Sequence, residues 1–203
     1  MIGFYNYTVV LTYIGFISGI IGIISASNGN ITTAIIALMF SGLCDMFDGK
    51  IASTKKRNHD ELNFGIQIDS LSDLVCFGVL PSIIGYNLGM DSIFYLPLLV
   101  LFPLTGLIRL AYFNVLETKK IKMLSKEPKE YLGLPITSTA FFLPLLYAFK
   151  PFFTNNFVDI YTLAMTMIGI LFVTRFKIPK LNMKELLLIL MTGLIILGFI
   201  LGN

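Results

Sequence analysis

The sequence predicts an all-α membrane protein, a bundle of six to seven transmembrane helices. Three observations support this fold class: the apolar composition, the recurrence of long apolar segments, and the placement of basic residues. Of the 203 residues, 56% are hydrophobic, and the mean hydropathy is +0.82. A soluble domain is about half apolar even when glycine is counted. The composition therefore excludes the ordinary soluble enzymes, and we expect membrane lipid rather than nucleic acid as a partner.

Seven apolar segments recur along the chain, and most have the roughly 17 to 25 residues needed to cross a hydrocarbon core. They comprise residues 8–26, 31–52, 65–88, 93–116, 134–149, 157–174 and 185–202. The fifth is short and contains Pro144, so six spans is the alternative. The length suits a single membrane-embedded domain over residues 1–203.

Basic residues are concentrated in alternate connections between these segments. Of the lysines and arginines, only Lys150 lies in one of the intervening connections. By the positive-inside rule, the basic connections face the cytoplasm, which places the N-terminus inside and, with seven spans, the C-terminus outside. We therefore expect an integral protein of the cell (plasma) membrane. Thirteen of the 15 Lys and Arg residues lie after the second, fourth and sixth segments: Lys50, Lys55, Lys56, Arg57, Lys119, Lys120, Lys122, Lys126, Lys129, Arg175, Lys177, Lys180 and Lys184.

Four of the 12 acidic residues lie inside predicted spans or at their cytoplasmic ends. Asp45 and Asp48 are three residues apart, so they share one helix face. Asp69 and Asp73 are four apart and share a face of the next helix. A carboxylate at membrane depth costs roughly 2.5–3.5 kcal/mol even on lenient insertion scales, so four together require compensation. The two pairs lie at the same depth and are expected to face each other.

The chemistry of this set favours a polar metal site at the cytoplasmic side of the bundle. The single histidine, His59, lies in a polar loop, and neither Cys44 nor Cys76 has a CxxC partner. Oxygen donors without His or Cys select Mg²⁺, Mn²⁺ or Ca²⁺ over zinc. The spacing alone leaves three interpretations open: metal-dependent catalysis, a cation or proton pathway, and pairing of the aspartates with Arg109 and neighbouring lysines.

The residues around the aspartates resemble a known family signature. Asp45-Met-Phe-Asp48-Gly49-Lys-Ile-Ala52 is followed, after twelve residues, by Gly65-Ile-Gln-Ile-Asp69-Ser-Leu-Ser-Asp73. This pattern resembles the DxxDGxxAR and GxxxDxxxD signature of the CDP-alcohol phosphotransferase family. Three further stretches, DSLSDLVCFGVLP at 69–81, RLAYFN at 109–114 and GLP at 133–135, resemble its phosphatidylserine synthase branch. The likeness spans about residues 8–180, and the extra segment at 185–202 adds nothing to it.

The resemblance implies a role for each motif residue. Asp45, Asp48 and Asp69 are expected to bind two divalent cations, Mg²⁺ or Mn²⁺ with Ca²⁺ as a further candidate, which hold the pyrophosphate of CDP-diacylglycerol. Asp73 is expected to join these three as a metal ligand and to act as the general base. The residues expected to contact the CDP-lipid are Thr12, Asp45, Gly49, Ala52, Ser53 and Gly65.

Two positions depart from the family pattern. The arginine that follows the alanine is Ser53 here, and the serine that commonly precedes the Phe-Gly pair is Cys76. Another cation must then balance the negative charge of the pyrophosphate. The candidates within reach are Lys50, Lys55, Lys56 and Arg57.

Two other features have more than one interpretation. Arg109, near the cytoplasmic end of the fourth segment, could snorkel or contact a helix, or its planar guanidinium could bind a lipid phosphate or the carboxylate of serine. We favour the second role. Gly15 and Gly19 form a small-xxx-small step beside Thr12, which indicates helix packing or, as the sharper alternative, nucleotide contact.

The resemblance implies transfer of a phosphatidyl group from CDP-diacylglycerol to the hydroxyl of L-serine, giving phosphatidylserine and CMP. Direct displacement needs no covalently modified residue, which agrees with the lack of a plausible Cys or His nucleophile. Two alternatives remain: a sister transferase that uses glycerol phosphate or inositol (phosphate) as acceptor, and an ion-coupled transporter. The family also implies a homodimer.

Overall fold

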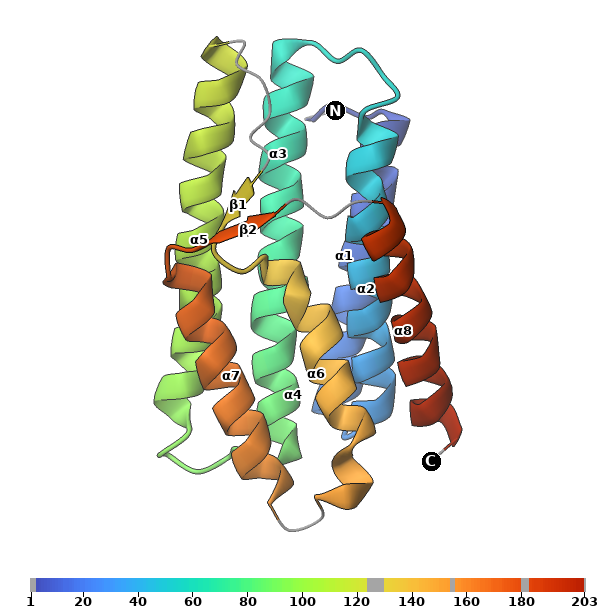
Figure 1. Cartoon of the computed structure of the whole chain (residues 1–203), viewed down its shortest axis with the longest axis vertical. Coiled ribbons are helices and arrows are strands. Elements are labelled where there is room, and N and C mark those ends of the chain that lie inside the picture. The colour runs from blue at the N-terminus through green and yellow to red at the C-terminus, as the bar shows by residue number, and fades with distance from the viewer. Residues whose placement is uncertain (1–2, 124–129, 154–155, 180–182, 203) are drawn as a thin grey trace.

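The computed structural model describes residues 3–123, 130–153, 156–179 and 183–202. Strands β1 (Glu130–Leu132) and β2 (Lys177–Pro179) pair in antiparallel fashion. Lys126, Lys129 and Lys180, which belong to the predicted basic connections, lie outside the described residues. The helices in the described part are α1 (Val10–Ser27), α2 (Ile31–Ala52), α3 (His59–Asp73), α4 (Leu80–Leu88), α5 (Leu96–Met123), α6 (Thr139–Ala148), α7 (Phe157–Val173) and α8 (Met183–Gly202) (Figure 1).

All seven predicted segments are helical. Among the described residues, five stretches are long and apolar enough to cross a membrane: Tyr7–Ser27, Ile31–Ala52, His59–Leu88, Leu96–Lys119 and Glu185–Gly202. The fifth and sixth predicted segments correspond to shorter apolar helices, Ile136–Ala148 and Phe157–Val173. The expectation of an all-helical membrane protein is thus confirmed, apart from the small sheet formed by β1 and β2, which the sequence did not predict.

α3 begins six residues before Gly65, where the sequence predicted its apolar segment to start. Asn58 caps it: its side chain accepts from the Glu61 N–H at 2.7 Å, and the Glu61 carboxylate accepts from the Asn58 N–H at 3.0 Å. This capping box satisfies backbone N–H groups that have no helical partner. The polar first turns of α3 therefore extend the bundle beyond its apolar part (Figure 1).

α3 continues into α4 through the π-helical segment Leu74–Val79. Within this segment the Leu80 N–H donates to the Val75 carbonyl, five residues earlier. Pro81 follows directly and has no N–H, so a regular helix would leave a carbonyl without its partner here. The wider turn absorbs this defect and begins immediately after Asp73.

α1 packs closely along α2 and the π-helical segment because glycines face both. The Ser41 hydroxyl donates to the Gly15 carbonyl at 2.9 Å. A Cβ at Gly15 would lie 3.1 Å from the Cys44 Cβ, and one at Gly19 would overlap the Cys76 sulfur. The small-xxx-small step therefore packs helices, the first of its two interpretations.

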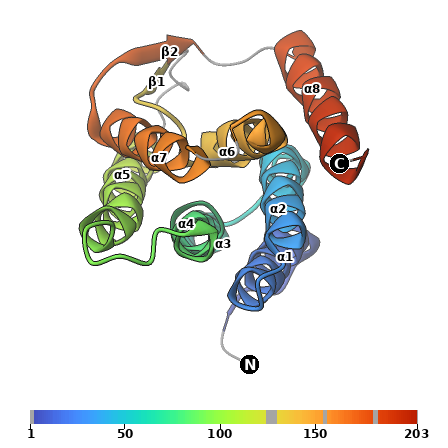
Figure 2. The same ribbon diagram turned by 90° about the horizontal axis from the view of Figure 1, so that it is seen from below.

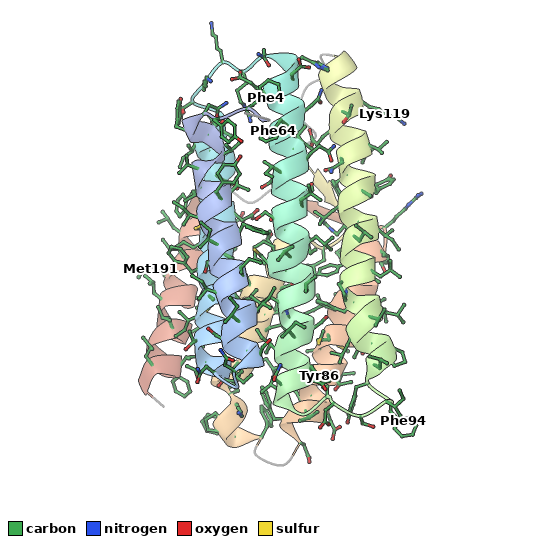
Figure 3. All side chains as sticks on the ribbon, turned by 180° about the vertical axis from the view of Figure 1, so that it is seen from behind. Phe4, Phe64, Tyr86, Phe94, Lys119 and Met191 are labelled. Carbon is green, nitrogen blue, oxygen red and sulfur yellow. The ribbon has the colours of Figure 1, made fainter. Side chains whose placement is uncertain are left out.

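Seen along the bundle, α3 and α4 form one column with α1 and α2 on one side and α5 on the other (Figure 2). α6 and α7 close a third side. Phe77, Leu80 and Ile84 in this column are at most 1% exposed, so the column is the centre of the core. α8 packs on α6 and α2 from outside, and Met191 points away from the bundle (Figure 3).

The two ends of the bundle differ in character. Lys119 lies at one end together with Phe4 and Phe64, whereas Tyr86 and Phe94 lie at the other (Figure 3). The connection between α2 and α3, which contains basic residues, is at the first end (Figure 1). The described chain begins near that end, and α8 finishes toward the opposite one (Figure 1).

Gly42 lets α2 approach α6. A Cβ at this position would lie 2.5 Å from the Ala140 Cβ, which is attached directly to the α6 backbone and cannot swing away. We therefore expect Gly42→Ala to force the helices apart and to lower stability by about 1–3 kcal/mol.

Thermal unfolding in detergent measures this loss, and Gly193→Ala in α8 is the matched control because a Cβ there meets nothing within 4 Å. Both substitutions change helix propensity alike, so their difference isolates the packing cost. Equal melting temperatures would contradict the close α2–α6 contact.

Candidate metal centre

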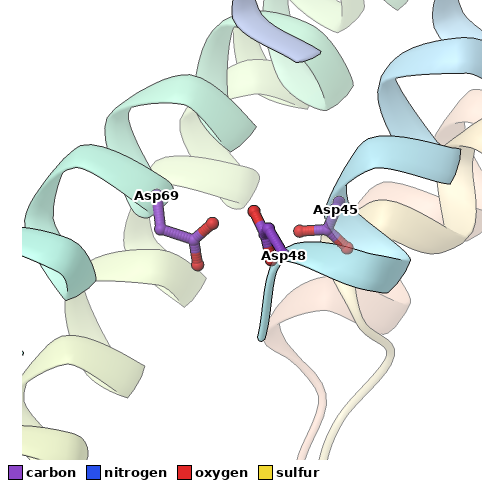
Figure 4. Close-up of side chains that lie close together, drawn as sticks. All are labelled: Asp45, Asp48 and Asp69. Atoms are coloured by element: carbon purple, nitrogen blue, oxygen red, sulfur yellow. The ribbon is translucent and has the colours of Figure 1, made fainter. Parts of the chain in front are cut away.

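Asp45 and Asp48 project from α2, and Asp69 projects toward them from α3 (Figure 4). The short connection of residues 53–58 joins the two helices, so the last turns of α2 lie beside the first turns of α3. Asp48 is buried, and Asp45 and Asp69 are half-buried. The expectation that the two helices present their aspartates to each other is met for these three residues.

One carboxylate oxygen from each of Asp45, Asp48 and Asp69 lies within 4.8 Å of the other two. We call these three residues the aspartate cluster. Oxygens bound to one divalent cation at about 2.0–2.6 Å are at most about 4–5 Å apart, so the spacing fits a shared ion. Three anionic oxygen donors without sulfur or imidazole also suit a hard cation. The aspartate cluster could therefore hold a divalent metal ion.

Asp73 lies beside the aspartate cluster and is not part of the three-residue group found among the described residues. It is one turn beyond Asp69 on α3 and only 8% exposed. Its carboxyl group is within hydrogen-bonding reach of the Asp45 carboxyl. The predicted roles of Asp73 as a metal ligand and general base therefore stay predictions.

Thr12 on α1 completes the surroundings of Asp48. Its hydroxyl donates to Asp48 Oδ2 at 3.0 Å and so fixes the orientation of that carboxylate. The adjoining cavity measures only about 10 Å³, so it is too small to hold a phosphate. The cavity is lined by Thr12, Gly15, Ser41, Cys44, Asp45, Asp48, Ser72, Asp73, Cys76 and Phe77.

No protein cation balances the carboxylates in the described part of the chain. The ion pairs formed there are Lys55–Glu61 at 3.0 Å and His59–Asp60 at 3.8 Å, and neither includes an aspartate of the site. Pairing with Arg109 and neighbouring lysines, one of the three interpretations, is therefore not observed. Partly buried carboxylates this close together need protons or an external cation.

The residues predicted to contact a CDP-lipid lie around the polar end of α2. A Cβ at Gly49 would meet nothing within 4 Å, so the backbone there is open to a ligand. Ala52 is the last residue of α2 and is half-buried. Ser53 follows it, is exposed, and donates its hydroxyl to the Lys50 carbonyl at 2.7 Å. Ser53 therefore ends the helix in this structure.

Gly65 and Arg109 are the last two residues that the sequence predicted for the site. Gly65 lies one turn before Asp69 on α3, and a Cβ there would be 3.0 Å from the Arg57 Nη1. Arg109 on α5 is buried, and its guanidinium carbon lies 4.5 Å from the centroid of the Phe113 ring. Its burial does not match a snorkelling side chain, whose charged head stays in water.

Sequence reasoning missed several neighbours of the aspartates. Ser41 and Ser72 line the small cavity. A serine within a helical segment does not reveal from the sequence which residues of other helices it will contact. Cys44 and Cys76 line the cavity too, and both are buried free thiols, which agrees with their predicted role in packing. The Arg57–Gly65 contact was also missed, because loop geometry decides which cation of a basic loop turns toward a helix.

A family model described as CDP-alcohol phosphatidyltransferase matches residues 5–176. The chain belongs to the CDP-alcohol phosphatidyltransferase family. The match includes the whole of α1 to α7 and every residue predicted for the site, whereas α8 lies beyond it.

Curated relatives in this family cover most of the chain. It is 30% identical over 185 residues to the CDP-diacylglycerol–serine O-phosphatidyltransferase of Helicobacter pylori strain J99, covering 85% of this chain and 73% of that protein. It is 30% identical over 147 residues to the protein of the same name from Bacillus subtilis, covering 70% of this chain and 81% of the relative. It is 31% identical over 169 residues to the archaetidylserine synthase of Methanothermobacter thermautotrophicus, covering 81% of this chain and 66% of that protein.

The hydrogen bond from Thr12 to Asp48 generates a test of the cluster. Thr12→Val keeps the shape of the side chain and removes the donor, so Asp48 loses the partner that orients it. Removal of such an outer partner typically lowers metal affinity by roughly 10- to 100-fold. Titration of the purified protein with Mn²⁺ measures this, and Thr12→Ser, which keeps the hydroxyl, is the control. An unchanged Mn²⁺ affinity in Thr12→Val would show that this bond does not support a metal ligand.

Proposed function

We propose that this protein transfers a phosphatidyl group from CDP-diacylglycerol to the hydroxyl of L-serine, giving phosphatidylserine and CMP. The observation that carries the proposal is the aspartate cluster, since the residues of the family signature come together in space as hard oxygen ligands. The names of relatives that match most of the chain support serine as the acceptor. The protein would then be a CDP-diacylglycerol–serine O-phosphatidyltransferase.

The aspartate cluster would hold two divalent cations, Mg²⁺ or Mn²⁺ with Ca²⁺ as a further candidate, and Asp73 would contribute at its edge. Such ions, when bound, neutralise phosphoryl oxygens and the departing CMP. The contribution of the chain is to position three carboxylates from two helices, with Asp48 held by Thr12. Gly49 offers open backbone for the nucleotide, and Ala52, Ser53 and Gly65 border the same end.

Asp73 would take the proton of the acceptor. The serine hydroxyl is a poor nucleophile until it loses that proton, and a carboxylate within reach can accept it as the bond forms. The serine oxygen bonds to the β-phosphorus while the bond from that phosphorus to the oxygen of CMP breaks, so no residue is covalently modified. The support for this role is position: Asp73 is buried next to Asp45 but stands outside the aspartate cluster.

Arg109 would bind the serine carboxylate or a lipid phosphate. A planar guanidinium matches a carboxylate or phosphate with two parallel hydrogen bonds. Burial beside Phe113 supports a fixed orientation, which such a bidentate contact requires.

The site would face the cytoplasm of the cell (plasma) membrane in a single domain of six to seven spans. The positive-inside rule supports this orientation, because the basic connection after α2 lies at the end of the bundle beside the cluster. Serine would be supplied at that face, while the acyl chains of CDP-diacylglycerol stay in the bilayer. A homodimer is the assembly expected for the family.

Release of CMP from CDP-diacylglycerol tests the reaction directly. We expect the purified protein to release CMP only when serine and Mg²⁺ or Mn²⁺ are both present, and to lose activity in excess chelator. Asp45→Asn should abolish both metal binding and turnover, because the cluster loses one anionic ligand. Asp91→Asn is the matched control, since Asp91 is exposed in the connection between α4 and α5 at the other end of the bundle.

Two results would contradict the proposal. Full turnover in excess chelator would remove the metal from the mechanism. Faster CMP release with glycerol phosphate or inositol phosphate than with serine would leave the mechanism in place but replace the acceptor.

The role of Asp73 gives a separate prediction. Asp73→Asn keeps the shape of the side chain but cannot accept a proton, so the chemical step should slow by roughly 10²- to 10⁴-fold. Binding of CDP-diacylglycerol should change little, because Asp73 stands outside the aspartate cluster. Single-turnover kinetics separate the two effects. A normal rate of CMP formation in this variant would rule out Asp73 as the base.

A further inference from the structure

The connection between α2 and α3 departs from the family pattern at one charged position. Where the signature has arginine, this chain has Ser53, whose hydroxyl caps α2 by donating to the Lys50 carbonyl at 2.7 Å. The aspartate cluster lies just below this connection, and the described residues place no ion-paired lysine or arginine on it. A diphosphate bound there would carry negative charge that a nearby cationic side chain must balance.

Three of the four candidate cations are engaged elsewhere or turned to solvent. Lys55 forms an ion pair with Glu61 at 3.0 Å, and Glu61 is itself fixed by the α3 capping box. The Lys50 ammonium lies 5.3 Å from the centroid of the Phe47 ring. Lys56 is exposed. The contacts of Lys55 and Lys50 given above are with Glu61 and Phe47, and neither is with the face of α3 that carries Asp69.

Arg57 is the exception. Its Nη1 lies 3.0 Å from the position that a Cβ would occupy on Gly65, so the guanidinium rests against bare backbone of α3. Gly65 and Asp69 are four residues apart, which puts them on one helix face about 6 Å apart along the axis. Arg57 is half-buried, whereas its neighbour Lys56 is exposed. Within the described residues, no ion pair holds it.

We propose that Arg57 binds the diphosphate of the CDP-activated lipid and supplies the positive charge that position 53 lacks. The missing side chain of Gly65 creates the room in which the guanidinium lies one helical turn from Asp69. From there a guanidinium can reach phosphate oxygens of a substrate bound at the carboxylates and can bind them through two parallel hydrogen bonds. This inference rests on the proposed function, since it concerns the substrate of the same site.

The test compares Arg57→Ala with Lys56→Ala, which removes the same charge from the adjacent exposed position. CDP and CMP serve as soluble probes of the nucleotide site in competition with CDP-diacylglycerol. We expect Arg57→Ala to weaken CDP by about tenfold or more, and CMP by less, because the second phosphate is the group that loses its partner. The Michaelis constant for CDP-diacylglycerol should rise while the turnover number changes little. Lys56→Ala should behave like wild type.

Two further variants separate a role in binding from a role in folding. Arg57→Lys keeps the charge but not the planar fork, so it should restore CDP affinity only in part. Arg57→Ala combined with Ser53→Arg should recover affinity if an arginine at either position meets the same phosphate. A destabilised loop would be rescued by neither substitution and would alter CDP and CMP alike.

The outcomes distinguish this inference from the proposed function. Equal CDP affinity and equal Michaelis constants in Arg57→Ala and Lys56→Ala, with an active wild type, would overturn the role of Arg57 alone. A wild-type protein that releases no CMP from CDP-diacylglycerol with serine and metal would overturn the reaction itself. Tight CDP binding that depends on Arg57 would still stand in that case.

Discussion

Four carboxyl groups packed between two helices impose the requirement on which the rest of the structure depends: positive charge must reach them at the depth of the bilayer. Each carboxylate costs roughly 2.5–3.5 kcal/mol there, and the repulsion among neighbours adds to the cost. The described part of the chain pairs none of them with lysine or arginine. Within that part of the chain the carboxyl groups therefore need protons or a bound cation, so the site suits a ligand better than it stabilises the fold.

Close helix packing keeps these carboxyl groups together. Gly15 brings α1 against α2, and this places Thr12 one turn away, where its hydroxyl reaches Asp48. Gly42 brings α2 against α6 on another side. Small residues give no hydrophobic driving force between helices in lipid, but they let backbones approach and gain dispersion contacts. The same substitutions that loosen the bundle would therefore spread the aspartates, so stability and metal binding are linked through α2.

The sequence predicted the site better than it predicted the local structure that holds it. Residue spacing was enough to predict the aspartate cluster. Aspartates three or four residues apart lie on one face of each helix, and two consecutive helices have few ways to turn those faces toward each other. The early start of α3 was missed because a capping box at Asn58, not hydropathy, sets it. The π-helical segment before Pro81 and the β1–β2 pair were missed because each depends on tertiary contacts. The position of the Asp73 carboxyl group relative to the aspartate cluster depends on side-chain orientations, which spacing does not give.

Charge balance at Asp73 favours a zwitterionic acceptor over a phosphorylated one. Serine carries a carboxylate and an ammonium, so its arrival next to Asp73 and Asp45 adds no net charge. Glycerol phosphate would bring about two negative charges to carboxyl groups that, in the described residues, have no paired cation. In its proposed role Arg109 on α5 would supply one guanidinium to the acceptor, and Arg57 lies near the polar end of the site. One fixed cation suits the single carboxylate of serine, whereas a phosphate monoester would require more.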